Sequence, residues 1–266
     1  MPGRARQELR WRSELLWETD ARPSRGPKRG LTCDDVVRAA IRIADRDGIA
    51  ALTMQAAAEE LGFTTMALYR YFPSKEALID AIIDAAMGTP PRRTGPNGGW
   101  RRELERWAHA KRAMMISRPW LAELPFVAAP HGPNWLSWVE RAVEALSGTG
   151  LSAREVFDML HTIDGYVRGG SDTAISRAKA NARGMSDEDW EAAVAADLVR
   201  AVGNPRYPAL SALITSGSAG GAHTLDDCFD FGLERVLDGI QAYVDSRSGP
   251  STRRSKVSRR RQRASP

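Results

Sequence analysis

The stretch LTMQAAAEELGFTTMALYRYF, Leu52 to Phe72, decides the fold of this 266-residue chain. It holds two short runs of helical pattern separated by Gly62, where a tight turn needs the left-handed backbone that glycine adopts freely. Thr53 stands where a residue would cap the first run, and Pro73 ends the second. The spacing predicts a tight helix–turn–helix over residues 53–72. Its inner apolar faces are expected to come from Ala56, Ala57, Leu61, Phe63, Leu68 and Phe72.

The second helix of this hairpin has an unusual composition for a purely structural element. Within two turns it carries two tyrosines, a methionine and Arg70, and the hairpin has room to bury few of them. Small side chains let a helix approach DNA, hydroxyls reach phosphates, arginine reaches guanine and apolar groups contact the thymine methyl. We therefore interpret it as a recognition helix, with an ordinary packed helix pair as the alternative.

Helical patterns continue on both sides of the hairpin. Thr32 and Asp35 resemble a capping box for a helix that stops at Gly48, and Ser74 caps a further helix. Residues 89–99 form a loop rich in glycine and proline. Segments with helical periodicity are then separated by short segments rich in Gly and Pro. No segment rich in Val, Ile and Thr shows the alternation of apolar and polar residues that predicts a strand. The fold class expected is all-α, with a three-helix helix–turn–helix domain at 31–88 and a larger helical bundle at 100–246.

Charge is unevenly distributed along the chain. The net charge is +5, but the tail 249–266 contributes +7 and residues 1–30 contribute +4, which leaves −6 for 31–248. Basic termini either keep a protein soluble or contact a polyanion such as nucleic acid. The Pro and Gly residues of RPSRGPKRG, 22–30, predict a flexible basic arm over 1–30. The low apolar content of 247–266 predicts a disordered basic tail.

Several classes of protein are disfavoured by the sequence. No apolar run approaches the roughly 18–20 residues that span a bilayer, and no signal peptide is expected, which favours a cytoplasmic location. Cys33 and Cys228 lie too far apart in the sequence to suggest a disulfide framework or a metal cluster. No catalytic triad order, phosphate loop or metal set is evident, so we expect neither an enzyme nor a cofactor. His161 and Asp164 share a helix face, but two ligands without a third are weak evidence for a metal.

The segment GIAALTMQAAAEELGFTTMALYRYFPSKEALIDAIID, residues 48–84, resembles the DNA-binding domain of the tetracycline-repressor family. That family shares the patterns LT-x(4)-A-x(2)-LG, LY-x-(Y/H)-(F/V) and K-x-x-L. The matching residues are Leu52, Thr53, Ala58, Leu61, Gly62, Leu68, Tyr69, Tyr71, Phe72, Lys75 and Leu78. The resemblance implies a homodimeric transcriptional repressor that a small-molecule effector releases from a palindromic DNA operator.

The resemblance also implies which residues contact DNA. Tyr69, Tyr71 and Lys75 are expected at phosphates, and Tyr69 as a partly buried core residue is the alternative. Thr53 would cap its helix and meet the backbone, with Gln55 near base edges. The major groove would be faced by Thr64, Thr65, Met66, Ala67 and Arg70.

Bulk charge on the helix–turn–helix domain cannot attract DNA. Residues 31–88 hold five basic and nine acidic side chains, a net charge of −4. We therefore expect the arm around Arg25, Lys28 and Arg29 to supply the attraction, along the DNA backbone or in the minor groove.

The C-terminal half resembles the family's ligand-binding and dimerisation domain. FDFGLERVLDGIQAYV, 229–244, is similar to its last helix, which with the helix near 152–170 would build a dimeric four-helix bundle. Packing within one chain is the alternative. The interface residues expected are Phe157, Leu225, Phe229, Gly232, Val236, Ile240 and Tyr243.

The effector is expected to differ from that of the tetracycline repressors. Those proteins hold a magnesium–tetracycline chelate with a mid-domain histidine, but RPWLAELPFVAAP, 118–130, contains none. Tryptophans in the region 104–170 are first of all core, and some can line an apolar pocket between helices. The pocket residues expected are Trp107, Met114, Phe126, Trp138, His161, Asp164, Tyr166 and Arg168.

Two other functions are kept as alternatives. A non-specific, chromatin-type DNA-binding protein would depend on its basic termini, so deleting 249–266 would abolish its affinity for DNA. A helical small-molecule-binding protein or carrier would have no use for the exposed face of 53–72.

Overall fold

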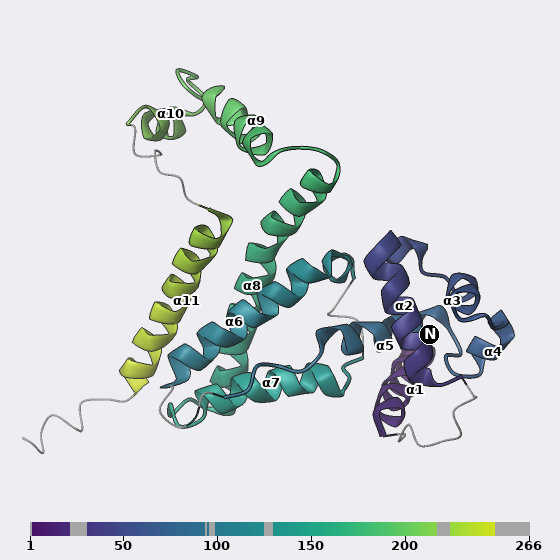
Figure 1. The fold of residues 1–266 in the computed structure, drawn as a ribbon. Helices are drawn as coiled ribbons and strands as arrows, with labels where there is room; N and C mark the ends of the chain where they lie inside the picture. Colours follow the sequence, from purple (N-terminus) through teal and green to yellow (C-terminus); the bar gives the residue numbers. More distant parts are fainter. Residues whose placement is uncertain are drawn as a thin grey trace, which may run out of the picture.

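The computed structural model describes residues 2–21, 31–93, 95, 99–124, 130–216 and 224–247. Throughout these residues the regular structure is helical, as the sequence predicts, and Figure 1 shows a small helical domain beside a larger one. The α-helices are α1 Pro2–Ala21, α2 Cys33–Asp47, α3 Met54–Leu61, α4 Thr65–Tyr69, α5 Lys75–Met87, α6 Gly99–Ser117, α7 Pro133–Leu146, α8 Ala153–Ala182, α9 Asp187–Val199, α10 Pro208–Thr215 and α11 Leu225–Arg247. Two 3₁₀ turns, η1 Ile49–Ala51 and η2 Pro119–Glu123, follow α2 and α6.

The small domain packs α2 to α5 around one apolar core. The Thr32–Asp35 capping box starts α2, and six of its apolar side chains are buried. Leu68 of α4 and Phe72 just after it are fully buried in this core, so the short α4 is anchored by its inner side alone. Phe63, expected on an inner face, is instead largely exposed at the turn.

The N-terminal segment differs from expectation. Residues 1–30 were predicted to be a flexible arm, but α1 covers Pro2–Ala21 and packs against α5. Its alternating charges pair within the helix, Arg10 with Glu14 at 2.9 Å and Arg12 with Glu8 at 3.8 Å, which supports helix formation. Leu16 is buried in the core of the small domain. The Pro and Gly residues of RPSRGPKRG, 22–30, follow the end of this helix.

The larger domain is a bundle of α6, α7, α8 and α11. A second apolar core joins these four helices, and Met87 at the end of α5 also belongs to it. The 30-residue α8 starts at a Ser152–Glu155 capping box, as predicted, and forms the longest element of the described chain. In Figure 1, α6 and α11 flank α8 while α7 crosses near its start.

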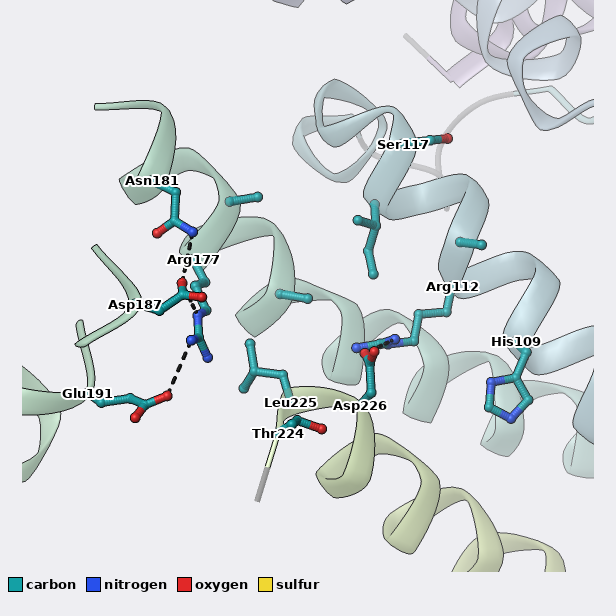
Figure 2. A pocket seen from close by; sticks show the side chains of 14 residues that line it. His109, Arg112, Ser117, Arg177, Asn181, Asp187, Glu191, Thr224, Leu225 and Asp226 are labelled. Atoms are coloured by element: carbon teal, nitrogen blue, oxygen red, sulfur yellow. Dashed lines mark hydrogen bonds and ion pairs between the residues drawn. The ribbon is translucent and has the colours of Figure 1, made fainter. Parts of the chain in front are cut away.

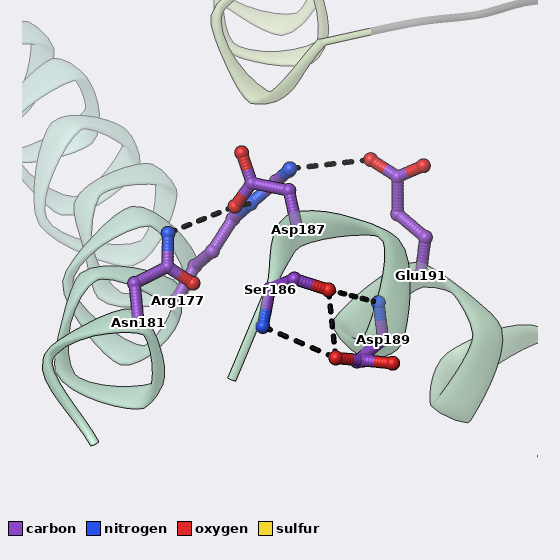
Figure 3. Close-up of polar contacts among 6 residues, drawn as sticks. All are labelled: Arg177, Asn181, Ser186, Asp187, Asp189 and Glu191. Carbon is purple, nitrogen blue, oxygen red and sulfur yellow. Dashed lines mark hydrogen bonds and ion pairs between the residues drawn. The ribbon is translucent and has the colours of Figure 1, made fainter. Parts of the chain in front are cut away.

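Helices α9 and α10 lie at the periphery, away from the bundle (Figure 1). None of their residues is buried in the chain. Asp187 and Glu191 of α9 bind Arg177 of α8 at 2.7 and 3.2 Å, and Asn181 also donates to Asp187 (Figure 3). The same figure shows the Ser186–Asp189 capping box that starts α9. Polar bonds to α8 therefore attach this segment.

Two connections join the domains besides α5 itself. Trp120 and Leu121 of η2 insert into the core of the small domain. The Trp120 indole donates to Asp45 Oδ1 of α2 at 2.7 Å, and Arg118 donates to the Ala86 carbonyl of α5 at 3.0 Å. The segment that follows α6 is therefore held on two helices of the smaller domain.

Candidate DNA-reading surface and effector pocket

The helix–turn–helix is fixed by local hydrogen bonds at each turn. The Thr53 hydroxyl accepts from Ala56 N at 2.9 Å and caps α3, as the sequence predicts. Gly62 ends α3 with φ 70°, in the left-handed region that other residues adopt at a cost. Thr64 then caps α4 by accepting from Ala67 N at 3.3 Å. These caps position α4 across the face of α3.

The outer face of α4 is exposed and uncharged except at its end. Met66 is 74% exposed and Tyr69 is 43% exposed, which favours a reading surface over the core position considered for Tyr69. Arg70 is exposed at the C-terminal end of the helix, while Thr65 and Ala67 are half-buried. On α3, the exposed Gln55 donates to Glu59 at 2.9 Å, a bond that must open before Gln55 can reach a base. Lys75 lies half-buried at the start of α5.

Tyr71 does not fit the phosphate contact expected of it. Its ring packs against the core of the small domain, and its hydroxyl donates to the Leu31 carbonyl at 2.7 Å. The hydroxyl hydrogen is therefore committed to the backbone just before α2. The bond ties the end of the recognition helix to the point where the N-terminal segment enters the domain. Arg25, Lys28 and Arg29 lie outside the described residues.

A partly open, mainly aromatic cavity of about 200 Å³ lies between α6, α7 and α8. Trp107 and Trp138 meet edge to face, with ring centroids 5.9 Å apart, and the Trp107 indole donates to the Trp138 carbonyl at 3.0 Å. Lys111 forms an ion pair with Asp164 and lies 4.8 Å from the centroid of the Trp107 ring. The cavity is lined by Trp107, Lys111, Trp135, Trp138, Val139, Phe157, Leu160, His161 and Asp164.

Lys111 is the buried charge of this cavity. Burial lowers the pKa of its ammonium group, and the Asp164 carboxylate opposes that shift. An ammonium group beside indole rings can bind the carbonyl, phenolate or carboxylate of an aromatic ligand through a charge-assisted hydrogen bond. The site thus combines flat apolar walls with one strong polar contact.

The prediction of the cavity from sequence was partly correct. Four of the expected residues line it: Trp107, Trp138, His161 and Asp164. Met114 faces a different hollow at the end of α5, and the Tyr166 hydroxyl donates to the Phe229 carbonyl at 2.7 Å on another side of α8. Arg168 is half-buried on α8 and is absent from the lining, and Phe126 lies outside the described residues.

Five lining residues were not in the set expected from the sequence: Lys111, Trp135, Val139, Phe157 and Leu160. Lys111 follows Trp107 by one helical turn, a spacing that could have pointed to it. Phe157, expected at a dimer interface, is 58% exposed and also lines this cavity.

A larger hollow of about 990 Å³ lies between α6, α8 and the starts of α9 and α11 (Figure 2). Its two arginines already have partners, since Arg112 binds Asp226 at 2.7 Å and Arg177 binds Asp187 and Glu191. Both hollows therefore contain paired charges, and the tryptophan-lined cavity has the more apolar walls.

The residues of α11 expected at a dimer interface do not all face the same way. Some are buried in their own chain and others keep accessible surface. Phe229 and Ile240 are buried in the core of their own chain and have no surface to offer a partner. A Cβ at Gly232 would lie 2.3 Å from the Tyr166 hydroxyl, so this glycine serves packing within the chain. These three positions correct the prediction. A helical period identifies a stripe, but not the neighbour that the stripe packs against.

The remaining stripe residues keep some accessible surface. Leu225 and Val236 are half-buried, and Tyr243 is exposed while its hydroxyl donates to Glu155 at 2.7 Å. Gly239 has no atom within 4 Å of an added Cβ.

The cavity is connected to the DNA-reading domain through α7 and α5. The Trp138 indole donates to the carbonyls of Met87 and Gly88, at 3.2 and 3.1 Å, where α5 ends. Asp84 of α5 accepts from the backbone N–H groups of Asn134 and Trp135, at 3.1 and 2.9 Å, and so caps α7. Movement of α7 would therefore strain its hydrogen bonds to α5.

Comparison with known proteins identifies the family. The description "Bacterial regulatory proteins, tetR family" matches residues 36–82, and "Tetracyclin repressor-like, C-terminal domain" matches residues 92–244. The chain belongs to the tetracycline-repressor family. It is a transcriptional repressor of that family and not an enzyme.

A relative of known name covers most of this repressor. The HTH-type transcriptional repressor DrrR1 of Streptomyces coeruleorubidus is 37% identical over 90% of this chain and 87% of its own length.

Two solved structures are also similar to it. ActR of Streptomyces coelicolor, in complex with actinorhodin, shares the fold with a TM-score of 0.68 at 22% identity, over 81% of this chain and 99% of that one. BioQ bound to its natural double-stranded DNA operator matches with a TM-score of 0.50 at 32% identity, over 56% of this chain and 89% of that one.

Two kinds of feature are absent from the described part of this repressor. Within 2–21, 31–93, 95, 99–124, 130–216 and 224–247, no helix is long and apolar enough to cross a membrane. In the same ranges no group of three His, Cys, Asp or Glu side chains could hold a metal ion. His131, the first histidine after 118–130, stacks on Trp135 at 3.8 Å between ring centroids.

Proposed function

We propose that this repressor reads its operator with the exposed face of α4 and releases it when an aromatic effector enters the tryptophan-lined cavity. The observation that carries the proposal is the Trp138 indole, which lines the cavity and also binds the carbonyls at the end of α5. The effector must bind the DNA-incompetent arrangement better than the competent one, because otherwise no population shifts.

At the operator, two copies of α4 would enter successive major grooves about one helical turn, roughly 34–36 Å, apart. Met66 and Ala67 would contact thymine methyls, Arg70 a guanine, and Tyr69 and Lys75 phosphates. The regulator works where the chromosome is, so we place it in the cytoplasm. Its dimer would use the outward faces of α8 and α11, where Gly165, Gly169 and Gly239 leave room for a partner helix.

The DNA-binding part is tested by fluorescence anisotropy with the palindromic DNA that flanks the gene and with a scrambled duplex. Arg70→Ala should cost about 1–3 kcal/mol and relax selectivity at one base pair. The control Arg38→Ala removes an exposed arginine of α2 that already pairs with Asp34 and Asp35. Equal affinity for both duplexes would contradict sequence-specific reading.

The contribution of the basic arm needs substitutions rather than truncation, because removing residues 1–29 would also remove α1. Replacing Arg25, Lys28 and Arg29 with Gln should weaken operator binding and flatten its salt dependence. The slope of log affinity against log salt should fall by about 0.9 for each phosphate that the arm no longer neutralises. An unchanged slope would show that the arm does not neutralise phosphates, so that Arg70, Lys75 and backbone dipoles must attract the DNA.

The assignment of the cavity is tested by the same titration with a panel of planar aromatic acids, phenols and quinones. A true effector should weaken operator binding and quench tryptophan fluorescence. Lys111→Met should remove the response to it while leaving operator affinity without the compound within about twofold. If a compound released the operator from the wild type and from Lys111→Met at the same concentration, the effector site would lie elsewhere.

A further inference from the structure

Helix α1 lies outside both regions that match the family, yet it is bound tightly to the core of the protein. The Arg12 guanidinium binds Asp80 of α5 with two hydrogen bonds, Nε to Oδ2 at 2.6 Å and Nη2 to Oδ1 at 2.7 Å. The two side chains are only 14% and 2% exposed. A buried, two-bond pair of this kind holds both distance and orientation, unlike an exposed ion pair.

Asp80 and Asp84 lie one turn apart on α5 and bind different elements. Asp80 is held by α1, whereas Asp84 caps the N-terminus of α7. Both carboxylates are buried, so each depends on its protein partner for the hydrogen bonds that water would supply. The helix that leaves the DNA-reading domain is therefore fastened on both sides within one turn.

Helix α1 also contacts α7 directly. It consequently contacts both α5, the last helix of the DNA-reading domain, and α7, one of the three helices that line the cavity. Leu16 adds an apolar anchor in the core of the small domain, with Trp11 and Leu15 packed beside it. The three helices α1, α5 and α7 thus form one contact unit at the junction of the domains.

We propose that α1 is an interdomain strap that makes α5 and α7 move together, so that events at the cavity and at the DNA are coupled through Arg12 and Asp80. Without this pair, the hydrogen bonds from α1 no longer fix the orientation of α5 relative to α7. The regulatory consequence rests on the proposed function, but the mechanical coupling of the domains does not. Coupling between two sites is reciprocal, so DNA must change the affinity of the cavity for its ligand by the same factor as that ligand changes the affinity for DNA.

The test uses the full chain and a double variant, Arg12→Met with Asp80→Leu, which replaces the buried pair with apolar side chains. Such replacements often keep stability, whereas removing one partner leaves a buried charge without compensation. Arg12→Lys is a second variant that keeps the charge but cannot make both bonds. The control is Arg10→Met on the same helix, since Arg10 is 80% exposed and pairs only with Glu14. Circular dichroism checks that each variant is folded.

The first readout is calorimetry without DNA. The wild type and Arg10→Met should unfold in one transition, whereas the double variant and Arg12→Lys should show two, because the domains no longer unfold together. The strap proposal would be overturned by two unfolding transitions in the wild type, or by a single unfolding transition in every folded variant.

The second readout is amide hydrogen exchange of residues 133–146 with and without the operator duplex. In the wild type the operator should slow exchange in α7 by about fivefold or more, and the double variant should lose most of this effect. Equal protection in the wild type and the double variant, both saturated with operator, would overturn the strap. If the wild type bound no operator, the proposed function would fail, and calorimetry alone would decide the strap.

Discussion

At the residue scale, the junction depends on a small residue opposite a buried carboxylate. A Cβ at Gly132 would lie 2.3 Å from Cγ of Asp84 and 2.5 and 2.6 Å from its carboxylate oxygens. Those oxygens are the atoms that cap α7. A side chain at position 132 and the Asp84 cap therefore exclude each other.

Gly132→Ala should lower the free energy of unfolding by about 1–3 kcal/mol, because the methyl group displaces the cap into a packed site. Urea unfolding followed by circular dichroism measures the change. The matched control is Ser137→Ala at an exposed position of α7, which should change it by no more than about 0.5 kcal/mol. Equal effects of the two substitutions would argue against the close contact.

The indole N–H of Trp138 is the other decisive group at this scale. Trp138→Phe keeps an aromatic ring but leaves the Met87 and Gly88 carbonyls without their donor, at a cost of about 1–3 kcal/mol beyond the lost packing. Trp135→Phe is the control. It removes the same side-chain volume from a neighbouring tryptophan, whose ring stacks on His131. Unfolding by urea should separate the two variants. If Trp135→Phe cost as much, the N–H bonds would contribute little.

At the element scale, the sequence predicted the helix–turn–helix correctly because its signals are local. The Thr53 cap, the left-handed Gly62 and the buried Leu68 and Phe72 all act within a few residues. The N-terminal helix was missed because the Pro and Gly residues of 22–30 were taken as evidence against helix throughout 1–30. The oppositely charged residues between positions 8 and 14 lie four apart, a spacing that favours a helix.

Long-range packing was the part that local patterns could not give. Which neighbour covers Phe229 and Ile240, and where Tyr71 directs its hydroxyl, follow from residues far away in the sequence. Of the residues that line the cavity, the sequence pointed only to Trp107, Trp138, His161 and Asp164. Lys111 completes it through an ion pair across 53 positions of the chain.

The ends of α8 and α11 are joined by a carboxylate with a shifted pKa. Hydrogen bonds from the Ser152 hydroxyl, the largest cause, and from the Tyr243 hydroxyl lower the pKa of Glu155 from 4.5 to about 2. A carboxylate whose pKa is lower in the folded state stabilises the fold above its unfolded pKa, and this contribution is lost as pH falls through the folded value.

Between about pH 5 and pH 2, the Tm of the wild type should therefore fall more steeply than that of Glu155→Gln. Thermal unfolding across this range measures the difference between the two curves. Glu105→Gln, at an exposed position of α6, is the control and should follow the wild-type curve. A Glu155→Gln curve parallel to the wild type would show that these hydrogen bonds do not favour the ionised form.

At the scale of the whole molecule, the protein consists of two cores held in register by α5, η2 and α1. The family binds operator DNA as a dimer, and our proposal is that the outward faces of α8 and α11 form its interface. Gly169 lies on that face with no atom within 4 Å of an added Cβ. Leucine there fits a single chain but not a close helix contact.

Gly169→Leu should therefore shift the protein from dimer to monomer without lowering its helical content, since leucine is a better helix former than glycine. Size-exclusion chromatography with light scattering measures the mass. Gln7→Leu, on the exposed side of α1, should leave the dimer intact. A dimeric Gly169→Leu protein would place the interface on another face.

The central claim is that a dimer of this repressor reads DNA with two copies of α4. Hydroxyl-radical footprinting on the DNA upstream of its own gene tests this most directly. The account predicts two protected half-sites, centred about one helical turn apart, that disappear in Arg70→Ala and survive deletion of 249–266. Uniform protection that disappears when 249–266 is deleted, or no protection at all, would contradict it.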